Sequence, residues 1–183
     1  MVLQLPAMTV EEFDRFFRLP ENHNRNLEYI GGKVYDTLTS PLSSAIGARM
    51  GGFIGMYLMN NKIGYLTNAR GGYIVSGERY IPDIGFISYA KQPELDYFDG
   101  YIQNPPDLAV EVQSPGNDDE DMAIKVANYL AAGTVVWLLK PQAKQVAVFV
   151  PAQAVKVLNS DGVLDGGKVL PGFTLRVADI FVK

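Results

Sequence analysis

The segment from residue 108 to residue 139 constrains the fold most, because it has the pattern of a strand, a helix and a second strand. Leu108–Val112 and residues 135–139 are short apolar runs. Between them, residues 118–130 have an apolar face at helical spacing and an acidic first turn, and Gly133 follows as a stop. A helix can connect two neighbouring parallel strands of one sheet. The segment therefore predicts an α/β fold.

Further helices and strands are predicted on both sides of this unit. Thr9 and Glu12 form a capping box for a short helix that ends before Pro20. Gly31 and Gly32 suit the turn of a hairpin. The remaining predicted elements are a long helix at Pro41–Asn60 and strands at residues 27–30, 34–38, 73–75, 80–88, 145–150, 154–158 and 173–177. We expect one domain, residues 1–183, with a mixed β-sheet flanked by helices and additional antiparallel strands near the C-terminus.

The long helix has a glycine stripe. Gly47, Gly51 and Gly55 recur at intervals of four residues, and each lowers helix propensity by roughly 1 kcal/mol. Glycines at this spacing allow another backbone to approach closely. We favour tight packing within the chain, with a homodimer through this helix as the alternative.

Composition limits the chemistry that the chain can perform. It contains no Cys and one His, which excludes thiolate catalysis and Cys-ligated zinc and disfavours a His-based site. Carboxylates, lysines and hydroxyl groups remain. The net charge of −4 gives no general attraction to nucleic acid, so phosphate contacts must be local, and the candidates are Lys33, Arg49, Arg70 and Arg79.

The sequence indicates neither secretion nor a membrane span. Residues 1–8 have no basic segment ahead of an apolar run. The longest apolar stretch, residues 45–59, is interrupted by Arg49 and is shorter than the roughly 20 residues that a bilayer requires. We expect a cytoplasmic protein with no membrane partner.

Two acidic residues interrupt apolar runs. Asp83 lies between Pro82 and Ile84, and Glu111 lies between Val110 and Val112. An unpaired buried carboxylate is expensive. If the two strands are neighbours, the carboxylates converge as a hard-oxygen pair suited to Mg²⁺ or Mn²⁺ and to phosphodiester cleavage. The structural alternative is that Asp83 caps a turn and Glu111 neutralises a buried Lys or Arg.

Lys125 has two interpretations. It shares a helix face with Asp121, four residues earlier, and the two side chains suit a solvated ion pair. Its long side chain could instead extend toward Glu111, which lies on the preceding strand. Helical periodicity does not decide between these interpretations.

Several ordered motifs resemble a known family. They are Pro82-Asp83-Ile84, the run at residues 106–115, the helix residues Asp121, Lys125 and Tyr129, Gly133, the strand residues Val136-Trp137-Leu138, Glu28 with the hairpin glycines, and residues 170–173. Together they resemble the Uma-two family of predicted endonucleases, over nearly the whole chain. The resemblance implies a restriction-endonuclease-like fold and a variant PD-(D/E)xK site.

The resemblance also implies roles for individual residues. Asp83 and Glu111 would hold Mg²⁺ or Mn²⁺, with the Val112 carbonyl as a further ligand. Lys125 would be a displaced catalytic lysine that positions the attacking water. Glu28 would be an auxiliary acid near the metal.

The sequence departs from the usual pattern at three positions. Gln113 stands where the usual motif has its lysine, so the positive charge must come from Lys125. Ser44 replaces a histidine that relatives often have, and Lys140 replaces an aspartate.

The sequence is compatible with three functions. The leading prediction is a metal-dependent endonuclease that hydrolyses DNA. The second is an inactive binding or assembly module that has kept the fold. The third is a phosphodiesterase that acts on RNA or another nucleotide substrate.

Overall fold

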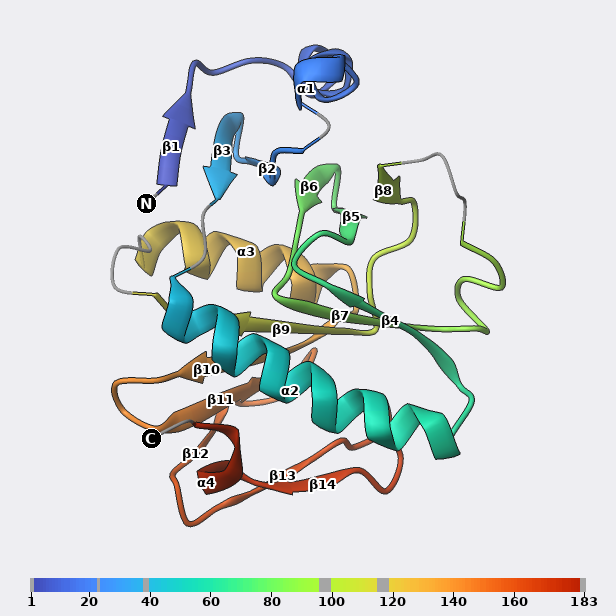
Figure 1. The fold of residues 1–183 in the computed structure, drawn as a ribbon, viewed down its shortest axis with the longest axis vertical. Helices are drawn as coiled ribbons and strands as arrows, with labels where there is room; N and C mark the ends of the chain where they lie inside the picture. Colours follow the sequence, from blue (N-terminus) through green and yellow to red (C-terminus); the bar gives the residue numbers. More distant parts are fainter. Residues whose placement is uncertain (1, 23, 38–39, 96–99, 115–118, 182–183) are drawn as a thin grey trace.

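The computed structural model describes residues 2–22, 24–37, 40–95, 100–114 and 119–181. These residues form two six-stranded sheets, a small two-stranded sheet and helices that cover them (Figure 1). We call the two large sheets the central sheet and the outer sheet. The predicted α/β class with a mixed sheet is confirmed.

The central sheet contains the predicted strand, helix and strand unit. Its strands, in spatial order, are β12 (Lys156–Leu158), β11 (Gln145–Phe149), β10 (Val135–Lys140), β9 (Leu108–Val112), β7 (Ile84–Ser88) and β4 (Gly64–Asn68). β9 and β10 are parallel and joined through α3 (Asp119–Ala131), as predicted, whereas the other neighbours are antiparallel. The sheet is therefore mixed.

Helices cover both faces of the central sheet. α2 (Pro41–Asn60) packs on one face, where Val110 and Val112 point into an apolar cluster. α3 packs on the other face, where Ala109 and Val136 contact a second cluster. The alternation along β9 therefore separates two cores, and Glu111 belongs to the α3 side.

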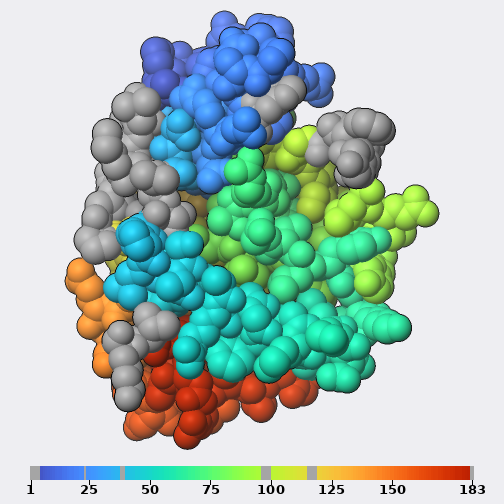
Figure 2. All heavy atoms as spheres, viewed as in Figure 1, coloured from blue at the N-terminus to red at the C-terminus, as the bar shows by residue number. Residues whose placement is uncertain are grey.

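The glycine stripe of α2 faces the central sheet. A Cβ at Gly47 would lie 3.7 Å from Asp83 Cβ, and one at Gly51 would lie 2.8 Å from Ile84 Cδ1. Tight packing within the chain is confirmed, and the homodimer stays an untested prediction. Figure 2 shows the opposite side of α2 running across the surface of the molecule. Within the described parts of the chain, no helix is long and apolar enough to cross a membrane.

The strands of the outer sheet all lie before residue 103. Its strands, in spatial order, are β1 (Val2–Leu5), β3 (Lys33–Thr37), β2 (Leu27–Ile30), β6 (Glu78–Tyr80), β5 (Gly72–Val75) and β8 (Tyr101–Ile102). The hairpin at Gly31 and Gly32 is confirmed, and both glycines have positive φ, at 57° and 80°. α1 (Val10–Phe17) begins with the predicted capping box and buries Phe13 in a third cluster.

The C-terminal segment covers the α2 side of the central sheet. It contains β13 (Val163–Asp165), β14 (Thr174–Arg176) and α4 (Val177–Ile180). Leu164, Leu175 and Ile180 all belong to the cluster beneath α2. The additional C-terminal antiparallel strands are thus present, as β11 with β12 and as β13 with β14.

The predicted strand at residues 80–88 is two strands in different sheets. β6 ends at Tyr80 in the outer sheet, and β7 begins at Ile84 in the central sheet. Pro82 has no N–H to donate to a ladder, which favours a break at this point. Asp83 therefore lies where the chain passes from one sheet to the other. β1, β4, β8, β13 and α4 were not predicted from the sequence.

Candidate active site

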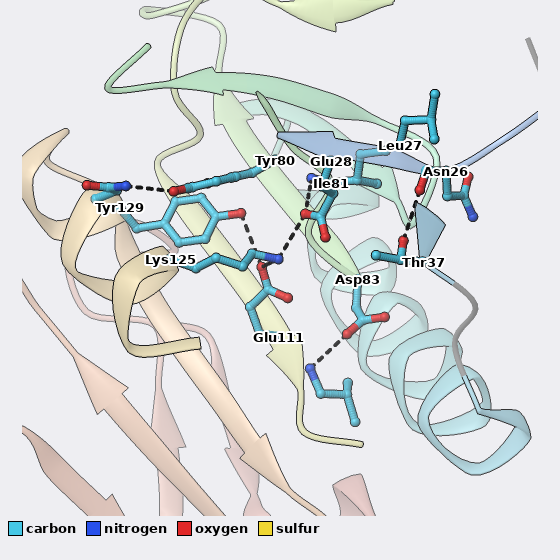
Figure 3. Close-up of polar contacts among 12 residues, drawn as sticks. Asn26, Leu27, Glu28, Thr37, Tyr80, Ile81, Asp83, Glu111, Lys125 and Tyr129 are labelled. Carbon is cyan, nitrogen blue, oxygen red and sulfur yellow. Dashed lines mark hydrogen bonds and ion pairs between the residues drawn. The ribbon is translucent and has the colours of Figure 1, made fainter. Parts of the chain in front are cut away.

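Three buried charged side chains meet between the two large sheets. Glu28 comes from β2 of the outer sheet, Glu111 from β9 of the central sheet, and Lys125 from α3 (Figure 3). Their relative exposures are 4%, 5% and 6%. Charged side chains are almost never this buried unless they are paired.

Lys125 bridges the two glutamates. Its Nζ lies 2.9 Å from Glu28 Oε1 and 2.9 Å from Glu111 Oε1. Glu28 Oε1 also accepts the Ile81 backbone N–H at 2.8 Å. The predicted solvated ion pair between Lys125 and Asp121 is therefore wrong, because this face of α3 is turned inward. The interpretation that Glu111 neutralises a buried lysine is confirmed as a structural fact, and a catalytic role is compatible with it.

Asp83 is fixed beside β9, the strand that carries Glu111. Its Oδ2 accepts the backbone N–H of Val112 at 2.8 Å, one residue after Glu111. In an extended strand the N–H and C=O of one residue point toward the same neighbour. The Val112 carbonyl is thus directed to the Asp83 side, beyond the start of β7. Asp83 therefore stabilises the end of the β9 ladder instead of only capping the turn after Pro82.

Burial dominates the electrostatics of the carboxylates. Burial raises the pKa of Asp83 to about 6, although the Val112 N–H and the charge of Lys125 oppose this shift. Burial also raises the pKa of Glu111, and the charges of Glu28 and Asp83 add to the effect, while Lys125 opposes it. Burial alone would lower the pKa of Lys125, but the charges of Glu111 and Glu28 raise it above its ordinary value. Lys125 is therefore a cation at neutral pH.

The donor set fits a hard divalent cation. Two carboxylates pair with the Lys125 ammonium, and a third, that of Asp83, lies beside the same strand, so acidic groups outnumber the cation. Between the described residues, the hydrogen bonds and ion pairs of Asp83 involve Oδ2, and those of Glu111 involve Oε1. Those residues contain no group of three or more His, Cys, Asp or Glu side chains arranged around a metal position. Mg²⁺ needs only one or two carboxylates with carbonyl, water or phosphate oxygens, which Asp83, Glu111 and the Val112 carbonyl can provide.

Two tyrosines without a predicted role enclose the charges. The Tyr129 hydroxyl donates to Glu111 Oε1 at 3.1 Å, and Lys125 Nζ lies 5.6 Å from the centre of the Tyr80 ring. Tyr129 follows Lys125 by four residues, so helical spacing already placed it on the same face. Tyr80 offered no comparable signal, because it lies on the outer sheet.

Gln113 hydrogen-bonds to the first residue of α3. Its Nε2 donates to Asp119 Oδ1 at 3.0 Å, at the start of α3. Arg79, a predicted phosphate contact, is instead buried and donates two hydrogen bonds to Asp14 at 3.0 and 2.7 Å. That prediction is wrong for Arg79, which joins β6 to α1.

Comparisons with known proteins agree with this architecture. A crystal structure described as a putative nuclease belonging to DUF820, from Anabaena variabilis, superposes with a TM-score of 0.82 at 22% sequence identity, covering 95% of this chain and 97% of that chain. The restriction-endonuclease-like fold expected from the resemblance is thus supported by a solved structure. No curated protein matches the sequence. The sequence profile of Uma2, described as "Putative restriction endonuclease", matches residues 13–178, so the chain belongs to this family.

Proposed function

We propose that this chain is an endonuclease that depends on a divalent metal ion and hydrolyses phosphodiester bonds of DNA. One observation carries the proposal: the buried Lys125 ammonium lies 2.9 Å from Glu111, and Asp83 is joined to the next residue of the same strand. An acid pair with an adjacent lysine can hold a divalent cation and place a positive charge beside a phosphodiester. The family description and the nuclease description of the structural relative support the same function.

Asp83 and Glu111 would hold the ion, together with the Val112 carbonyl. Mg²⁺ or Mn²⁺ would supply Lewis-acid activation of the phosphodiester when bound. The raised pKa of Asp83, about 6, leaves this carboxylate mostly ionised at pH 7 to 8. A cation would lower the cost of burying these negative charges.

Lys125 acts as a hydrogen-bond donor and positive charge. Its raised pKa keeps it protonated, so it does not serve as a general base. An ammonium has three N–H donors, and Glu28 and Glu111 account for two of them. The third can orient a water whose oxygen bonds to phosphorus while the bond to the leaving oxygen breaks. The proton lost by the water passes to solvent, and the leaving oxygen takes a proton from solvent.

Glu28 positions Lys125. Its Oε1 accepts both the Lys125 ammonium and the Ile81 N–H, at 2.9 and 2.8 Å. These two bonds favour a role for Glu28 beside Lys125, whereas the resemblance implies an acid nearer the metal.

Contact with the DNA backbone requires exposed cations around the site. Lys33 and Arg70 are exposed, whereas Arg49 is exposed but also donates to the Asp179 carbonyl at 2.6 Å. These residues remain candidates for local phosphate contacts.

A substrate panel tests the proposal. The purified chain is incubated with plasmid, linear duplex, single-stranded DNA and RNA in Mg²⁺, Mn²⁺ or EDTA, beside Asp83→Asn. We expect cleavage of DNA that requires the metal and is lost in Asp83→Asn. Cleavage of RNA alone would support the phosphodiesterase alternative. Equal cleavage by both proteins, or none, would contradict the proposal and favour an inactive module.

A further inference from the structure

The hydroxyl of Tyr129 has no part in the chemistry described so far, yet it lies at the centre of the site. The side chain is fully buried, and its hydroxyl donates to Glu111 Oε1 at 3.1 Å. The same oxygen accepts the Lys125 ammonium at 2.9 Å. Two donors from α3 therefore converge on one oxygen of Glu111.

These two bonds fix the orientation of the carboxylate. A carboxylate held through one oxygen by two donors cannot rotate without losing both hydrogen bonds. In Figure 3 the second oxygen of Glu111 points away from Lys125 and Tyr129, on the side where Asp83 lies. This oxygen is the one that a cation shared with Asp83 would use.

The Tyr129 ring is itself held in place. It packs against the ring of Tyr80 with centroids 5.2 Å apart at an interplanar angle of 64°. The Tyr80 hydroxyl accepts a hydrogen bond from Asn128 Nδ2 at 2.7 Å. Lys125, Asn128 and Tyr129 share one face of α3, so one helix supplies the lysine and the groups that orient its surroundings.

We propose that Tyr129 is a positioning residue, which holds Glu111 so that its second oxygen is presented to a divalent cation beside Asp83. This inference rests on the proposed metal-dependent function. Groups that hydrogen-bond to a metal ligand orient it, and their removal typically costs about 10-fold to 100-fold in metal affinity or activity. A merely structural role would lower stability and leave metal affinity unchanged.

Tyr73 is a matched control. It is also fully buried in the cluster beneath α3, and its hydroxyl hydrogen-bonds to Thr67 Oγ1 at 2.9 Å. Tyr73→Phe and Tyr129→Phe each remove one buried hydroxyl and keep the ring. Only the Tyr129 hydroxyl contacts a proposed metal ligand.

Calorimetric titration with Mn²⁺ tests the inference on the full chain. We expect Tyr129→Phe to bind Mn²⁺ about 10-fold more weakly than wild type, and Tyr73→Phe to bind it as wild type does. Circular dichroism and the thermal midpoint confirm that each variant is folded at the titration temperature. Should Tyr129→Phe be unfolded there, Tyr129→Met, which keeps an apolar side chain without the donor, replaces it.

The outcomes separate the two proposals. Unchanged Mn²⁺ affinity in a folded Tyr129 variant, with clear binding by wild type, overturns the positioning role and leaves the proposed function standing. A loss of affinity in Tyr73→Phe equal to that in Tyr129→Phe also overturns it, because the effect would be one of general stability. No Mn²⁺ binding by wild type overturns the metal-dependent function, and the positioning role with it.

Discussion

The two faces of β9 bury opposite kinds of side chain. On the α2 face, Val110 and Val112 join a cluster of apolar residues that includes the fully buried Ile54. On the α3 face, Glu111 is buried under Lys125 and Tyr129. One strand therefore contributes to a core that stabilises the fold and to a polar site whose burial is costly.

The proposed function accounts for this difference. A buried ion pair adds little net stability, because desolvation offsets the attraction, and apolar replacements are often neutral or stabilising. The α2 side already supplies an extensive apolar core. The proposed function gives a reason for the charges on the α3 side that stability does not give.

The largest expected loss of stability comes from a substitution on the α3 face. Lys125→Met removes the cation that neutralises Glu28 and Glu111, which then remain buried together. We expect the free energy of unfolding to fall by about 3 to 5 kcal/mol at pH 8, measured in urea. The exposed Lys156→Met is the control. A loss below about 1 kcal/mol would show that the buried charges are not coupled as described.

The matching change on the α2 face should act on stability alone. Ile54→Ala leaves a cavity in the apolar cluster, and we expect a loss of about 2 to 4 kcal/mol. Mn²⁺ affinity of the folded variant, measured by calorimetry, should equal that of wild type. A large change in affinity would mean that the two faces are not independent.

Asp83→Asn should stabilise the protein at high pH. Because the pKa of Asp83 is raised from 3.8 to about 6 in the folded state, its contribution to stability is full below pH 3.8 and is lost as pH rises through 6. Asparagine keeps an acceptor for the Val112 N–H and carries no charge. We expect a gain of roughly 1 to 3 kcal/mol at pH 8 that disappears near pH 3, measured by urea unfolding. Wild type being equally or more stable at pH 8 would refute this prediction.

The smallest effect distinguishes two neighbouring glycines of α2. A Cβ at Gly52 would meet nothing within 4 Å, so Gly52→Ala should raise stability by up to about 1 kcal/mol through helix propensity. A Cβ at Gly51 would lie 2.8 Å from Ile84 Cδ1, so Gly51→Ala must move this buried side chain. We expect the thermal midpoint to rise only in Gly52→Ala. A similar rise in both would mean that α2 is not closely packed.

The sequence predicted the elements that short motifs and residue periodicity determine. The capping box of α1, the glycine hairpin between β2 and β3, and the β9, α3 and β10 unit are all present. The division into two sheets was not predicted, because residues 80–88 have the pattern of one apolar strand. Only the position of Pro82 indicated the break that places Asp83 between the sheets.

The candidate site was predictable to the extent that each residue departed from its local pattern. Asp83 and Glu111 interrupt apolar runs, and the structure brings them to the same end of β9. The pairing of Lys125 with Glu28 joins residues 97 positions apart, and helical spacing favoured the nearer Asp121 instead. The role inferred for Tyr129 required the contact with Glu111, because a buried tyrosine on a helix face is ordinary core in sequence terms.

Nicking of supercoiled plasmid in Mg²⁺ tests the central claim most directly, with wild type, Glu111→Gln and the exposed control Glu21→Gln compared at equal folded concentration. Glu111→Gln keeps the shape of the side chain and leaves Lys125 paired with Glu28, but it removes a proposed metal ligand. We expect its nicking rate to fall at least about 100-fold, because losing a ligand should cost no less than losing a group that orients one, while Glu21→Gln nicks as wild type does. Equal rates in all three proteins would contradict the assignment of the α3 face of β9 as an active site.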